Sequence, residues 1–337
     1  MAFLTDGDPN HPYTKTDYDL MILAAESMHP DLFRRLNPRT YPEISGYYST
    51  KVLASSLMDM IAMMDAAASN PDHAPNSARL IVPALGYHIQ RRMPIMFLAQ
   101  SFVDALKLTD FKEDLDWTTM PLPYEHGILA LPKNSLVHPV DGDCAFIMFS
   151  RYREGVENWP PSTVGVNRPI AMADDSFCVC GMFPSAGLWY DTCITKRSKP
   201  VIRIRNVFEG GEGKQAFPLT TQFDTDLETD ADRDMAAKLA ALTFGTILAL
   251  TARPDLLTPA THTNTIFNKK SGKRTEFWSP NIVGKHYSPR KAPTGEPGTH
   301  QSPRMHWRRG HFRNQHYGPA RSQIKMIWLE PQLVNSE

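Results

Sequence analysis

The strongest indication of the fold comes from Thr229–Ala252, which reads TDADRDMAAKLAALTFGTILALTA. Acidic residues open it, and Ala and Leu fill it, a composition that favours a helix. Arg253-Pro254 ends it, because proline cannot continue a helix. Its apolar part, Leu239–Thr251, is shorter than the roughly 18 apolar residues that a membrane span requires. The segment therefore predicts a long core helix, and no membrane partner is expected.

A β-rich region precedes this helix. Short apolar or alternating runs, separated by clusters of Pro, Gly and Ser, are typical of strands. These runs are Ala145–Arg153, Ser176–Met182, Gly187–Ile194 and Pro200–Val207. They predict a central, mainly antiparallel sheet.

Nearer the N-terminus, helix-forming composition with apolar residues near helical spacing predicts helices at Tyr18–Leu36, Thr50–Ala68 and His88–Leu108. Asp110–Pro132 is rich in Pro and acidic residues and is expected to be irregular. The predicted N-terminal part is therefore helical.

The C-terminal quarter has a different composition. Lys, Pro, Gly, Ser and Thr dominate Thr261–Ser302, which predicts a long, poorly structured connection. Alternating residues in Pro303–Arg313 and Gln323–Pro331, joined through Tyr317-Gly318-Pro319, predict a basic β-hairpin. The expected fold class is α+β. We divide the chain into a body (1–260), a basic connection (261–302) and a hairpin segment packed on the body (303–337).

Charge is balanced overall but unevenly distributed. His262–Glu337 holds 13 Lys and Arg against 4 Asp and Glu, a net charge of +9, which leaves 23 against 32, or −9, for residues 1–261. Such asymmetry suggests an electrostatic partner for the tail, with nucleic acid the first candidate. The alternative is that the basic tail packs against the acidic body. The N-terminal residues show no apolar signal core, so a cytoplasmic location is expected.

The most unusual string is RMHWRRGHFR at Arg304–Arg313, with four arginines, two histidines and two aromatic residues. Arginine binds phosphates through two N–H groups, and aromatic rings stack on bases, so the string is suited to RNA or ribosome contact. The candidate binding residues are His306, Trp307, Arg308, Arg309, Gly310, His311, Phe312 and Arg313, with Lys269 and Lys270 upstream. The same residues could instead form an internal cluster that holds the hairpin to the body, or bind a protein.

Catalytic and metal chemistry finds little support. Cys144 beside Asp143 is a weak candidate nucleophile, and Asp141 with Asp143 could ligate a cation, although Asp-Gly is first a turn signal. Cys178, Cys180 and Cys193 lack a paired metal-binding motif, so buried free cysteines are expected. We predict no catalytic residue, no metal and no cofactor.

The C-terminal string resembles the anti-CRISPR proteins of phages and plasmids that act against the type V-A (Cpf-type) effector nuclease. Chains of that family end with a basic P-H-x-R-R-G-H-aromatic signature and a final strand containing W-x-x-P. Upstream, Pro254-Asp255 and Asn268–Gly272 also look like family features, and Met305 stands where the family tends to have proline. The matching signature residues are His306, Arg308, Arg309, Gly310, His311, Phe312, Trp328 and Pro331.

The resemblance implies a mobile-element inhibitor that lowers production of the effector. Such proteins are thought to recognise the emerging N-terminal peptide of the effector and to promote loss of the message being translated. The partners implied for this chain are therefore that nascent peptide and, through the basic tail, RNA or the ribosome of the bacterial host cell. A general RNA- or DNA-binding regulator without a CRISPR target is the alternative function, and a histidine-dependent nuclease is a more remote one.

Overall fold

The structure is a computed structural model that describes residues 46–48, 95–111, 115–116, 122–152, 176–185, 188–195, 201–202, 208, 230–259, 261–267, 274–279, 281–291 and 306–334. The helices expected at Tyr18–Leu36 and Thr50–Ala68 lie outside these residues. The described part has the α+β architecture predicted from the sequence, with two α-helices and several sheets.

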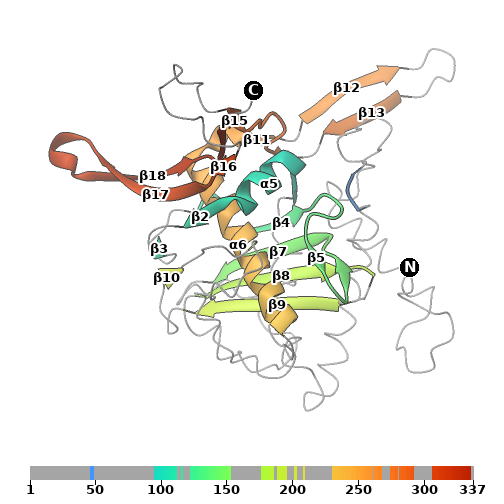
Figure 1. Cartoon of the computed structure of the whole chain (residues 1–337). Helices are drawn as coiled ribbons and strands as arrows, with labels where there is room; N and C mark the ends of the chain where they lie inside the picture. Colours follow the sequence, from blue (N-terminus) through green and yellow to red (C-terminus); the bar gives the residue numbers. More distant parts are fainter. Residues whose placement is uncertain are drawn as a thin grey trace.

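A seven-stranded sheet forms the centre of the molecule, in the order β11-β14-β1-β4-β7-β8-β9 (Figure 1). Strand β1 pairs in parallel with β14 and β4, and the other neighbouring pairs are antiparallel, so the predicted mainly antiparallel sheet is confirmed. The strands are β1 (Ile95–Leu98), β4 (His126–Ala130), β7 (Phe146–Tyr152), β8 (Ser176–Phe183), β9 (Leu188–Thr195), β11 (Leu257–Thr258) and β14 (Asn281–Val283).

Two predictions near the start of the sheet are wrong in part. The described part of the expected helix His88–Leu108 is strand β1 followed by helix α5 (Gln100–Lys107). Four consecutive apolar residues form β1, and a strand with partners on both edges buries such a run on both faces. The region expected to be irregular, Asp110–Pro132, contains β4, whose apolar residues are almost fully buried.

Helix α6 (Asp230–Ala252) confirms the prediction of a long Ala/Leu helix and packs across one face of the sheet (Figure 1). Its window Asp234–Ala252 is long and apolar enough to cross a membrane, but 83% of that window is buried inside the protein. Two buried threonines, Thr243 and Thr246, donate hydrogen bonds to carbonyls one turn earlier, at 2.8 Å each. Gly181 of β8 lets the helix approach closely, since a Cβ there would lie 2.7 Å from Leu239. We conclude that α6 is a core helix.

The prediction of a poorly structured connection at Thr261–Ser302 is wrong for the part that the structure describes. Strands β12 (Thr261–Phe267) and β13 (Arg274–Ser279) pair with each other, and β14 enters the central sheet. β15 (Arg290–Lys291) pairs with a C-terminal strand. β12 and β13 are neighbours along the chain, whereas β14 and β15 pair with partners far away in the sequence, and this pairing overrides the Lys- and Pro-rich composition that suggested an irregular chain.

Short strands complete the body. β3 (Leu115–Asp116) pairs with β10 (Val201–Ile202), so only two residues of the expected strand Pro200–Val207 are seen as strand, outside the central sheet. β5 (Val137–His138) and β6 (Gly142–Asp143) form a tight hairpin, and β2 (Thr109–Phe111) follows α5. The 3-10 helix η4 (Pro254–Leu256) follows α6.

The C-terminal β-hairpin is confirmed. β17 (Gly310–Tyr317) and β18 (Gln323–Leu329) pair over seven residues, joined by a turn that includes the 3-10 helix η5 (Pro319–Arg321). This hairpin forms a sheet with β2, in the order β18-β17-β2, and does not extend the central sheet. β16 (His306–Arg308) and β19 (Gln332–Val334) form a second small sheet with β15. The hairpin projects well beyond the rest of the described chain (Figure 1).

Candidate nucleic-acid interface

The candidate string is interrupted where β16 ends and β17 begins. Arg308 pairs with Gln332, and three positions further along each strand His311 pairs with Leu329, so the register is unchanged across the break. Pro331 lies inside the break and has no N–H to donate to a ladder. Gly310 faces it, and a Cβ at Gly310 would lie 2.7 Å from Pro331 Cδ and 2.8 Å from the Leu329 carbonyl oxygen. Close backbone approach therefore explains this glycine.

Phe312 points into the protein core. It is 0% exposed and stacks on Trp328, with ring centres 5.8 Å apart. Trp328 in turn stacks on Tyr287 and meets Phe102 edge to face. Its indole N–H donates to Thr109 Oγ1 at 3.3 Å. These contacts fasten the hairpin to α5 and β2, so the Phe312 ring has no open face for a base.

Arg309 binds the body. Its guanidinium donates to both carboxylate oxygens of Asp110, at 2.7 and 2.9 Å, and both side chains are mostly buried. Two-pronged contact of this kind is the strongest form of an arginine–carboxylate pair. Arg309 therefore serves the internal role that the sequence left open as an alternative.

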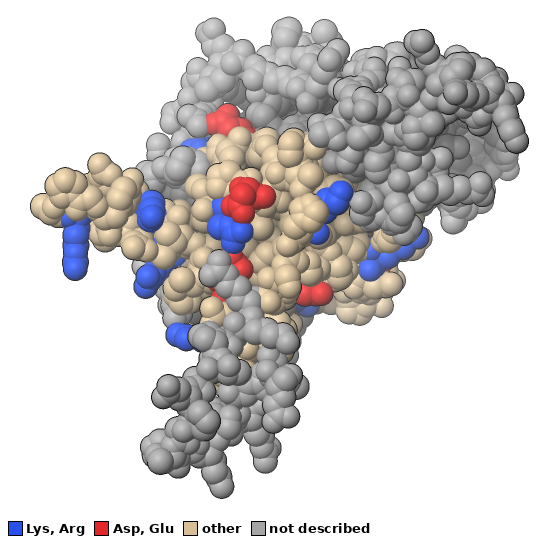
Figure 2. All heavy atoms as spheres, turned by 90° about the horizontal axis from the view of Figure 1, so that it is seen from above, with Lys and Arg blue, Asp and Glu red and all other residues tan. Residues whose placement is uncertain are grey.

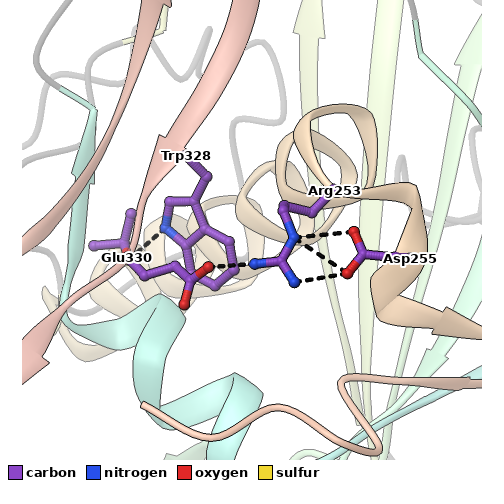
Figure 3. A network of polar contacts seen from close by, with 5 residues as sticks. Arg253, Asp255, Trp328 and Glu330 are labelled. Atoms are coloured by element: carbon purple, nitrogen blue, oxygen red, sulfur yellow. Dashed lines mark hydrogen bonds and ion pairs between the residues drawn. The ribbon is translucent and has the colours of Figure 1, made fainter. Parts of the chain in front are cut away.

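A second ion-pair network holds the other strand of the hairpin. Arg253, just after α6, binds both Glu330 and Asp255 (Figure 3). The hydrogen bond from Arg253 lowers the pKa of the Asp255 carboxyl. Glu330 is the only acidic residue in the segment 306–334, and this network engages it. The base of the hairpin is thus fixed on both strands.

The remaining candidates face outward. His306, Trp307, Arg308 and Arg313 are exposed, with 41% of the Trp307 surface accessible, and His311 is half-buried. Lys269 and Lys270 lie outside the described residues. Figure 2 shows Lys and Arg side chains, and no acidic ones, along the projecting hairpin. The accessible part of the candidate string combines cations with one open aromatic ring, which can contact phosphates and a base.

Among the described residues, one group of potential metal ligands lies close together: His138, Asp141 and Asp232. His138 Nδ1 is 2.6 Å from an Asp141 oxygen, whereas Nε2 is 3.3 Å from an Asp232 oxygen. The potential ligand atoms lie within 4.8 Å of one another, and His138 Nδ1 also accepts hydrogen bonds from the N–H groups of Val140 and Asp141, at 3.4 and 3.1 Å. The group ties the β5–β6 turn to the first turn of α6.

The comparisons with known proteins identify the family. The family model described as AcrVA2-like, the anti-CRISPR type V subtype A2 family, matches residues 96–336. The chain belongs to this family. No curated protein and no solved structure matches the chain. The suspected type V-A anti-CRISPR resemblance is thereby confirmed, and the match extends from β1 through the hairpin, well beyond the C-terminal signature that suggested it.

The anti-CRISPR signature thus mixes two kinds of residue. Gly310 and Phe312 are explained by packing and Arg309 by its ion pair, whereas His306 and Arg308 are exposed. Family membership supports an inhibitor role against the type V-A CRISPR system.

Sequence reasoning missed three residues of this AcrVA2-like hairpin. Tyr317 ends the first strand β17, Arg321 stands in the distal turn and Lys325 lies on the second strand β18, and all three are exposed. The Lys325 ammonium lies 5.3 Å from the centre of the Tyr317 ring. The signal that could have found them is the strand register. Once the turn is placed at 318–322, Lys325 pairs with Gln315, and it then shares a face with Arg313, which lies two residues before Gln315.

The Asp-Gly-Asp motif and Cys144 are explained by the β5–β6 hairpin of this anti-CRISPR protein. Asp143 accepts a hydrogen bond from the Asn134 N–H at 2.6 Å, and burial raises the pKa of its carboxyl. Asp141 faces His138, so the two carboxylates are engaged by different groups. Cys144 is fully buried and free, and Cys180 is a buried free cysteine, as expected for it.

We expect Cys144 to be unreactive in the native protein. Burial raises the pKa of its thiol far above the ordinary value, so the thiolate stays scarce even in mildly alkaline solution. Iodoacetamide labelling at about pH 8, close to the ordinary thiol pKa of about 8.5, should modify Cys144 only after unfolding when read by mass spectrometry. Rapid labelling of the native protein would contradict its assignment as a core residue.

Proposed function

We propose that this protein is a mobile-element inhibitor that lowers production of a type V-A CRISPR effector in the cytoplasm of its bacterial host. In this proposal it recognises the nascent N-terminal peptide of the effector while its C-terminal hairpin contacts RNA or the ribosome. The family supports the inhibitor role. The nascent-peptide step follows from what the family resemblance implies.

The observation that carries the RNA or ribosome contact is the projecting hairpin with its exposed cations. Arg308 and Arg313 are exposed, and the single acidic residue of the segment is held by Arg253 at the base. Such a surface attracts a polyanion, because no acidic side chain on the projecting part of the hairpin repels it. A hairpin anchored to the body could bring the inhibitor to the message that is being translated.

The test is a reporter in bacterial cells that carries the N-terminal codons of the effector, with message and protein both measured. We expect both to fall when those codons are read in frame, and neither to fall when a frameshift changes the peptide but preserves the RNA. Equal repression of both reporters would favour the general RNA-binding regulator. No repression of either would contradict the proposal for that effector.

The hairpin is tested in the same assay with Arg308→Glu combined with Arg313→Glu. We expect most of the repression to disappear while the fold is kept, because both side chains are exposed. Arg309→Glu is unsuitable, since it would place a carboxylate against Asp110 and disturb the anchor. The matched control is Lys133→Glu with Lys285→Glu, two exposed cations outside the hairpin segment. An equal fall in repression in the control would show a general effect of charge.

A further inference from the structure

The outer part of the hairpin, residues 313–327, forms a two-stranded ribbon, which we call the arm. β2 pairs only with Gly310–Phe312, so β17 has no third-strand partner in the described structure beyond that point. Each strand of the arm extends about 17 Å at roughly 3.4 Å per residue. A two-stranded ribbon alone in water is only marginally stable, which is consistent with a surface that is completed by a partner.

The register divides the arm into two different faces. Directly paired residues share a face, so Phe312 and Trp328 define the side that points into the core, followed outward by Asn314 with Met326 and His316 with Ile324. The opposite face carries Arg313 with Ile327, Gln315 with Lys325 and Tyr317 with Gln323. The short distance between Lys325 and the Tyr317 ring agrees with this assignment. The two cations of the strands are therefore gathered on one side.

A third cation, Arg321, stands in the distal turn. The turn is folded tightly: Arg321 N–H donates to the Gly318 carbonyl, and both Ala320 and Arg321 have positive φ angles of 50° and 56°. Non-glycine residues adopt this conformation only at some energetic cost. The arm has no acidic residue in its sequence, so no side chain within the arm neutralises the charge of the three cations.

From this arrangement we infer that the arm binds the phosphate backbone of folded, helical RNA. The inference deepens the proposed function and rests on it for the biological setting. Binding of single strands depends on aromatic rings on which successive bases stack. The cationic face has one ring, Tyr317, and Lys325 lies over it. Double-helical RNA is instead recognised mainly through its shape, its phosphates and its 2′-hydroxyls, which Arg, Lys and Gln side chains can contact.

The experiment measures binding of the full chain to an RNA hairpin and to an oligouridine with the same number of phosphates, across a series of salt concentrations. The test variant is Arg313→Gln with Lys325→Gln, and the matched control is Lys133→Gln with Lys285→Gln. We expect the test variant to bind the RNA hairpin about tenfold more weakly. Its salt slope should fall by about 2, because the variant leaves two phosphates without a neutralising cation. The control should bind as the native protein does.

Three outcomes would overturn the inference. Tighter binding of oligouridine, abolished in Trp307→Ala but not in the arm variant, would place single-strand stacking at the base of the hairpin. Equal weakening in the control would show that no particular surface is used. Absence of binding to either RNA would indicate a protein partner for the arm.

The reporter assay separates this inference from the proposed function. Arm-dependent RNA binding with an unresponsive reporter would keep the inference and reject the proposed function. A reporter that responds to the in-frame peptide while the arm variant retains full RNA affinity would reject the inference alone.

Discussion

Replacing Phe312 by alanine is expected to lower the free energy of unfolding by about 3–5 kcal/mol, the usual cost of removing a buried aromatic side chain. Phe312 is fully buried and stacks on Trp328, which connects the hairpin to Tyr287 and Phe102. The substitution should therefore loosen the attachment of the hairpin as well as the core. Urea unfolding followed by circular dichroism measures the effect.

The control for this prediction is the next residue. Arg313 is exposed, so Arg313→Ala should change the free energy of unfolding by no more than about 0.5 kcal/mol. A stable Phe312→Ala protein that fails in the reporter assay would contradict the packing role and would restore Phe312 to the binding surface suggested by the sequence.

The second large effect is expected for Gly310→Ala, which should cost about 3 kcal/mol, at the upper end of the range for overpacking. The added methyl group would lie 2.8 Å from the Leu329 carbonyl oxygen and from the Pro331 nitrogen. Both are backbone atoms, which cannot rotate away as a flexible side chain can. The two strands would have to separate at the point where β16 gives way to β17.

Gly46 offers a matched control, because a Cβ there would meet nothing within 4 Å. Gly46→Ala should leave the unfolding midpoint nearly unchanged in the same urea experiment. If Gly310→Ala unfolds at the native midpoint, the glycine of the signature is not needed for packing. Its presence in the signature would then have to be explained by contact with a partner.

Local composition was sufficient to predict the long helix and the three longest strands of the central sheet. α6 carries its own start and stop signals, and β7, β8 and β9 are long runs between turn residues. β14 could not be predicted in this way. It has three residues in a Lys- and Pro-rich region, and it becomes a strand by pairing with β1, where Asn281 donates a hydrogen bond to the Ile95 carbonyl 186 residues away.

The candidate site was predictable to a similar extent. Composition singled out the string Arg304–Arg313, but it could not separate the residues that bind the body from those that face outward. Asp110 lies 199 residues before Arg309, and nothing in the sequence links the two. Lys325 and Arg321 required the register of the hairpin, which depends on where the turn begins. Pairing information, not composition, was missing in each case.

The position of β14 between β1 and β11 has a consequence for how this protein is made. A ribosome completes β1 and β4 long before it reaches Asn281, so during synthesis the edge of β1 waits without its final neighbour. The central sheet can be completed only after β14 has left the ribosome, and the aromatic contacts of Phe312 and Trp328 can form only later still. A fragment ending near residue 260 would expose that unfinished edge, which is a template for aggregation. Full-length chains are therefore the appropriate material for dissecting this inhibitor.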